Sequence, residues 1–181
     1  MLAAVGQANA DPLTTPSMGA SLSANPSPTT VDAGPLGNIY VTGAVSGLGY
    51  IQDHKVPGDL KSRGDLSNAQ VFIQTTEGPV QFFVQAGAYS TPTVGVPYLK
   101  SSDATQDTYG VVPQAFVKIA PTSNLSILAG KLPTLIGSEY TFTFENLNVQ
   151  RGLLWNQENA VNRGVQVNYA HGPLSASVSV N

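Results

Sequence analysis

Apolar and polar residues alternate with a period of two over several short stretches of the chain. In residues 174–181 the two alternating sets are Leu174, Ala176, Val178 and Val180 against Ser175, Ser177, Ser179 and Asn181. A period of two places successive side chains on opposite faces of a β-strand. The same pattern predicts strands over residues 38–52, 65–76, 79–90, 111–120, 125–132, 164–170 and 174–181. The chain is therefore predicted to be all-β, with about seven strands.

The connections between these strands alternate in length. Long polar connections occupy 53–64, 91–110 and 133–162, and short turns occupy 77–79, 121–124 and 171–173. Bacterial outer-membrane barrels have this rhythm, because their periplasmic turns are short and their outer loops are long. The pattern favours an antiparallel up-and-down transmembrane β-barrel. Two alternatives stay open: a secreted β-sandwich that binds glycans or surfaces, and a barrel without a pore that serves as an adhesin or anchor.

The strand count and the end of the pattern predict part of a larger barrel. Single-chain bacterial barrels have even numbers of strands. The alternation stops at residues 178–181, without the terminal aromatic residue that is typical of outer-membrane barrels. We therefore expect an N-terminal portion, truncated at its C-terminus. The competing hypothesis is a complete barrel of eight strands, one of which the pattern does not reveal.

The composition limits the other classes of protein. Only 10% of the 181 residues are charged, whereas soluble domains carry about 25%. No apolar run approaches the roughly 20 residues that a spanning helix needs. The net charge of -3 gives no basic field for nucleic acid, and the absence of cysteine excludes disulfides and thiolate sites.

The N-terminal region lacks the strand pattern. Ala8-Asn9-Ala10 resembles a signal-peptidase site, so residues 1–10 are predicted to be the remnant of a signal peptide. Residues 11–35 are rich in Pro, Ser and Thr and are predicted to be a disordered linker. The barrel itself is expected over residues 36–181.

The third long connection, residues 133–162, carries the main candidates for function. Charged side chains that line a narrow section set the selectivity of a pore. The predicted pore constriction consists of Lys131, Glu139, Glu145, Arg151 and Arg163. The alternative is that these side chains are solvated loop charges. The glutamates also allow a glycosidase hypothesis, but nothing fixes their separation. No catalytic residue, metal site or cofactor is predicted.

Three aromatic residues do not fit a simple polar lumen. Phe72, Phe83 and Phe116 fall on the face that the alternation assigns to the lumen. Either these rings pack beneath an inserted loop, or the predicted register is displaced by one residue.

One stretch of the chain resembles a known family. Residues 130–139 read Gly-Lys-Leu-Pro-Thr-Leu-Ile-Gly-Ser-Glu, and Asn146-Leu147-Asn148, Arg151-Gly152-Leu153-Leu154 and 163–169, Arg-Gly-Val-Gln-Val-Asn-Tyr, follow. These segments resemble the OmpL-like β-barrel porins of Gram-negative bacteria. The resemblance implies an export signal, a barrel of well over 181 residues, a place in the outer membrane and passive conduction of solutes.

The expected partners follow from that class of protein. They are outer-membrane lipid, small polar solutes or ions, and the barrel-assembly machinery. A homo-oligomer is left open.

Overall fold

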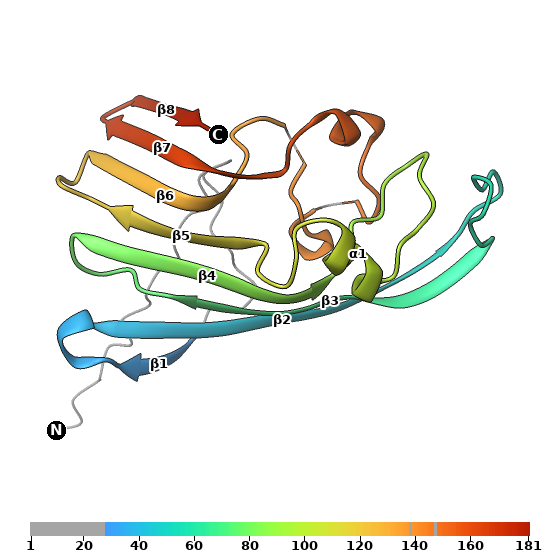
Figure 1. The fold of residues 1–181 in the computed structure, drawn as a ribbon, viewed down its shortest axis with the longest axis horizontal. Coiled ribbons are helices and arrows are strands. Elements are labelled where there is room, and N and C mark those ends of the chain that lie inside the picture. The colour runs from blue at the N-terminus through green and yellow to red at the C-terminus, as the bar shows by residue number, and fades with distance from the viewer. Residues whose placement is uncertain (1–27, 138, 147) are drawn as a thin grey trace, which may run out of the picture.

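The computed structural model describes residues 28–137, 139–146 and 148–181. Within them, eight strands form one antiparallel sheet in sequence order (Figure 1). The strands are β1 (Thr29–Asp32), β2 (Asn38–Ile51), β3 (Ser62–Gln74), β4 (Val80–Tyr89), β5 (Gln114–Ile119), β6 (Leu125–Pro133), β7 (Val161–His171) and β8 (Leu174–Val180). The helices are η1 (Gly34–Leu36), α1 (Ser101–Asp107), η2 (Thr143–Glu145) and η3 (Leu153–Gln157). The prediction of an all-β, antiparallel up-and-down fold is confirmed.

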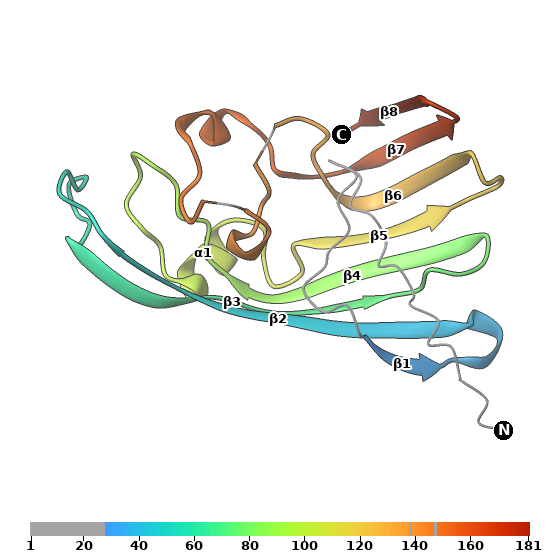
Figure 2. The ribbon, with the colours of Figure 1, turned by 180° about the vertical axis from the view of Figure 1, so that it is seen from behind.

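The sheet curves, with β1 at one edge and β8 at the other (Figures 1 and 2). Short turns join the strands at one end, and the connections 52–61, 90–113 and 134–160 lie toward the other end. In the described part of the chain β1 pairs with β2 and β8 pairs with β7, so the sheet is not closed on itself. This arrangement is consistent with part of a β-barrel.

The two faces of the sheet differ in chemistry. The face covered by residues 134–160 is called the inner face; its buried side chains include Asn68, Gln70, Phe72, Phe83, Gln85, Gln114, Phe116 and Gln166. The outer face exposes aliphatic side chains: Val45, Val71, Val117, Val165, Val167, Val178 and Val180. A soluble sheet would bury its aliphatic side chains, whereas a membrane barrel turns them toward lipid.

Phe72, Phe83 and Phe116 keep the predicted register and pack together on the inner face. The Phe83 and Phe116 rings stack at 5.2 Å between centroids. Phe144 of η2 packs against this group and meets Phe72 edge to face at 6.0 Å. The first of the two expectations for these rings is correct: an inserted loop covers them.

Gly130 leaves room for one of these rings. Its φ of 144° is unfavourable for other residues, and a Cβ here would lie 2.3 Å from the carbonyl oxygen of Ala115. Gly130 is the register partner of Phe116. The glycine therefore allows β5 and β6 to pair closely beneath the ring.

One local prediction was wrong. Residues 29–32 of the expected linker form β1, which pairs with residues 38–41 of β2. The expected count of about seven strands becomes eight among the described residues. The register of β2 against β3 shifts between Ser46 and Gly47, where Ser67 is the extra residue on β3. The second long polar connection, expected over residues 91–110, contains the short helix α1. Residues 1–10 and 11–27 lie outside the described part of the chain.

Candidate pore-lining segment

Residues 134–160, here called the inserted segment, fold back over the inner face of the sheet (Figure 1). The turn η2 makes the contact with the strands. The Oγ1 atom of Thr143 accepts a hydrogen bond from the Asn68 amide and donates one to Ser67 at 3.2 Å. The ring of Phe142 is fully buried and meets Tyr89 edge to face at 5.2 Å. The segment is thus attached by both hydroxyl and aromatic contacts.

Arg151 holds the inserted segment together from within. Its side chain is fully buried, and its guanidinium donates to the carbonyls of Tyr140 (3.2 Å), Thr141 and Pro92 (3.4 Å). The guanidinium also lies 5.1 Å from the centre of the Trp155 ring, a cation–π distance. Burial lowers the pKa of Arg151 to about 10, against the opposing effect of Glu139 and Glu145. The side chain therefore acts as an internal brace.

The backbone at Arg151 joins two connections of the sheet. Its N–H donates to Pro92 and its carbonyl accepts from Val94, both at 2.9 Å. These bonds form an isolated parallel bridge between Thr93 and Arg151. The β4–β5 connection and the inserted segment are consequently one unit.

Three acceptor side chains shape the turns of the segment. Both carboxylate oxygens of Glu139 accept from the Gly152 N–H, at 2.9 and 3.0 Å. Glu145 accepts from the Phe142 N–H at 3.3 Å, and Asn146 bonds both the N–H and the carbonyl of Tyr140. Burial raises the pKa of Glu145 to about 7, more than the Phe142 N–H and Arg151 lower it.

The structure does not bring the five predicted constriction residues together. Glu139, Glu145 and Arg151 lie within the inserted segment and interact electrostatically. Lys131 and Arg163 are register partners on β6 and β7, on the same face as the exposed Val165. The Lys131 ammonium donates to the carbonyls of Tyr109 and Val112. The expectation that Lys131 and Arg163 face the lumen disagrees with this placement, because strand alternation turns both to the outer face.

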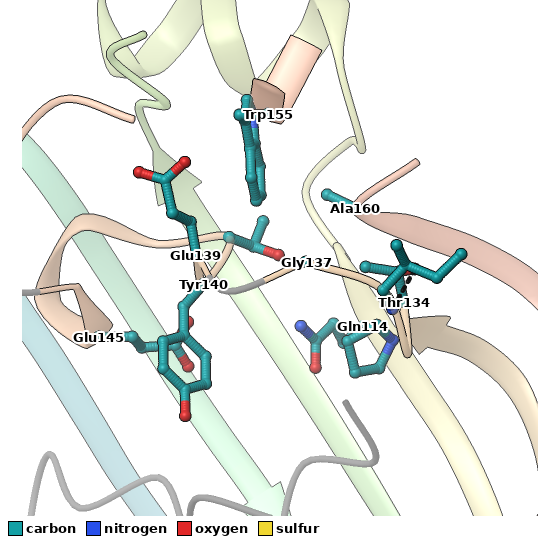
Figure 3. A pocket seen from close by; sticks show the side chains of 11 residues that line it. Gln114, Thr134, Gly137, Glu139, Tyr140, Glu145, Trp155 and Ala160 are labelled. Carbon is teal, nitrogen blue, oxygen red and sulfur yellow. Dashed lines mark hydrogen bonds between the residues drawn. The ribbon is translucent and has the colours of Figure 1, made fainter. Parts of the chain in front are cut away.

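A small cavity lies between the inserted segment and the inner face of the sheet (Figure 3). Its volume of about 10 Å³ is that of roughly one water molecule. The residues that line it include Gln114, Gly137, Tyr140, Glu145 and Trp155. Gln114 reaches toward it from β5 and is 2% exposed; within the described residues its Oε1 atom has no hydrogen-bond partner.

A second polar cluster anchors the β2–β3 hairpin. Arg63 forms an ion pair with Asp59 at 3.4 Å and lies 4.5 Å from the centre of the Tyr98 ring. The Tyr98 hydroxyl donates to Asp65 at 3.1 Å, and burial raises the pKa of Tyr98 to about 12. This cluster ties the hairpin to the β4–β5 connection. The sequence pattern gave no sign of it, since its members lie in separate connections and strands.

The described residues contain neither a metal-binding cluster nor a membrane-spanning helix. No group of three or more His, Cys, Asp or Glu side chains in residues 28–137, 139–146 and 148–181 is placed to hold a metal ion. None of the helices in that part of the chain is long and apolar enough to span a membrane.

The curved meander, the apolar outer face and the segment folded over a polar inner face define a porin-like β-barrel. Residues 38–181 match the family model described as beta-barrel porin-2, OmpL-like. The chain belongs to this family of porins, as the resemblance indicated. No curated protein and no solved structure gave a match. Porin-like barrels of this kind are generally outer-membrane proteins without enzymatic activity.

Proposed function

We propose that this protein is a passive outer-membrane channel of a Gram-negative bacterium for small polar solutes or ions. The observation that supports this most is the division of the sheet into an aliphatic outer face and an amide-rich inner face. Val165, Val167 and Val178 expose 49%, 41% and 68% of their surface, whereas Gln166 between the first two is fully buried. Lipid on one side and a hydrated lumen on the other account for this alternation.

The inserted segment is the part of the chain best placed to narrow such a channel. It lies across the inner face of β2 to β6 rather than at the rim, and Arg151, Thr143 and Phe144 hold it there. Glu139 and Glu145 are partly buried and remain candidates for charges that passing ions encounter. Arg151 acts on both of them electrostatically and keeps the local charge close to balance.

Planar-bilayer recording of the whole protein tests this function. We expect discrete conductance steps and a wild-type ion preference that shifts toward anions in Glu139→Gln. The matched control, Asp107→Asn, removes an exposed carboxylate at the end of α1 and should leave the preference unchanged. A correctly assembled protein that gives no conductance would contradict the channel and favour a barrel without a pore.

A further inference from the structure

The carboxyl group of Glu145 faces a space that requires a hydrogen-bond donor. Glu145 and Gln114 both line the water-sized cavity beneath the inserted segment (Figure 3). The Gln114 Oε1 atom is buried there without a partner among the described residues. An ionised carboxylate only accepts hydrogen bonds, so it adds a second acceptor, whereas a protonated carboxyl group supplies a donor. The protonated carboxyl group of Glu145 therefore supplies the donor that the Gln114 Oε1 atom lacks among the described residues, whereas the ionised form leaves two acceptors on the cavity.

The groups around Glu145 compensate the negative charge of its ionised form only in part. Arg151 is the positive charge that acts on Glu145, but its guanidinium donates to the carbonyls of Tyr140, Thr141 and Pro92. The carboxylate of Glu139 and the hydroxyl of Tyr109 act on Arg151 as well. From the strands, η2 meets uncharged groups: Ser67, Asn68 and the ring of Phe72. From β5, Gln114 adds an uncharged amide.

We propose that Glu145 is a pH-sensitive latch, whose protonation holds the inserted segment against the inner face and whose deprotonation loosens it. Glu145 occupies the last position of η2, the turn that carries the Thr143 and Phe144 contacts. Its ionisation therefore acts directly on the attachment of the segment to β2 and β3. Any effect on conduction rests on the proposed channel function: a docked segment narrows the lumen, and a loosened one widens it.

The direction of the effect follows from proton linkage. Burial raises the pKa of Glu145 from 4.5 to about 7 in the docked segment. The docked form thus binds the proton more tightly than the free form does. Docking is strongest below the free-form pKa of 4.5, weakens as the pH rises to about 7, and is constant above that. The docking equilibrium changes by at most about 300-fold over this range.

Trp155 reports on the latch without any need for conduction. It is the only tryptophan in the chain, belongs to the inserted segment and is 7% exposed. Acrylamide quenching of its fluorescence is measured on the whole protein in detergent, from about pH 4 to about pH 9. We expect quenching to rise with pH in the wild type. The isosteric variant Glu145→Gln should show low quenching at every pH, because it resembles the protonated form.

The control variant Asp107→Asn removes an exposed carboxylate and should keep the wild-type profile. A wild-type profile that is flat, or a rise that persists in Glu145→Gln, would overturn the latch. If Glu145→Gln fails to fold, Glu145→Ala tests the same loss of the titrating group. Bilayer recording over the same pH range separates the two proposals: a protein that never conducts refutes the channel, while the quenching profile still decides the latch.

Discussion

Removal of the Arg151 side chain tests whether the inserted segment is braced from within. In Arg151→Met, the carbonyls of Tyr140, Thr141 and Pro92 lose their charged donor, and Trp155 loses its cation. Hydrogen bonds from a charged donor contribute about 1.5–3 kcal/mol each, or about 5–9 kcal/mol for the three together. The variant also removes the cost of burying the guanidinium. The fall of its pKa from 12.5 to about 10 corresponds to about 3 kcal/mol of that cost. The net loss of docking free energy is therefore about 2–6 kcal/mol.

The assay compares Trp155 quenching and amide hydrogen exchange in the variant and the wild type. We expect increased quenching and faster exchange in residues 134–160, with little change in β2 to β7 away from the segment. Arg163→Met is the matched control, since Arg163 is exposed on the outer face and is removed from the segment's hydrogen bonds. If Arg151→Met retained wild-type quenching and exchange, the inserted segment would not depend on this side chain.

Three further changes follow from the contacts described above. Phe144→Ala removes the edge-to-face contact with Phe72 and should weaken docking of the inserted segment by about 1–3 kcal/mol. We expect Trp155 quenching that is higher than in the wild type but lower than in Arg151→Met. Unchanged quenching would refute a role for this contact. Gly130→Ala places a Cβ 2.3 Å from the Ala115 carbonyl and should slow assembly of the folded, heat-modifiable form on SDS gels, whereas Gly172→Ala at an open turn should assemble more readily than Gly130→Ala. Burial raises the pKa of Asp59, but hydrogen bonds from Gln52, Leu60 and Arg63 lower it below 3.8. The β2–β3 hairpin should therefore lose protection from hydrogen exchange as the pH falls below 3.8. Asp59→Asn should abolish that pH dependence.

The strands and their faces were predictable because lipid and lumen impose opposite chemistry on alternate residues. Along β8 the serines and the aliphatic residues separate cleanly, and residues 174–180 form the strand that the alternation predicts. β1 was missed because Thr29–Asp32 has no apolar alternation of its own. It is ordered by pairing with residues 38–41 of β2, and the pattern within residues 29–32 does not contain that contact between strands.

The candidate site was predictable in location but not in its contacts. The length and polarity of residues 133–162 indicated a loop that folds inward. The charge of Arg151 suggested an exposed filter residue, but the fold buries it among carbonyls. Gln114 was not predicted as a site residue, because an amide side chain on a strand is common. Only the inserted segment that covers it distinguishes its position. Lys131 and Arg163 were misplaced since the choice of face depends on the register of β6 and β7.

Access of a polar reagent to single side chains tests directly whether the outer face meets lipid and the inner face meets water. The chain has no cysteine, so single cysteines can be introduced one at a time along β7 and β8. The measurement is labelling by a membrane-impermeant maleimide in the whole protein reconstituted into lipid vesicles. We predict that Val167→Cys and Val178→Cys are protected while Ser175→Cys and Ser177→Cys are labelled. Equal labelling of both sets, or the reverse pattern, would show that the outer face does not meet lipid while the inner face meets water.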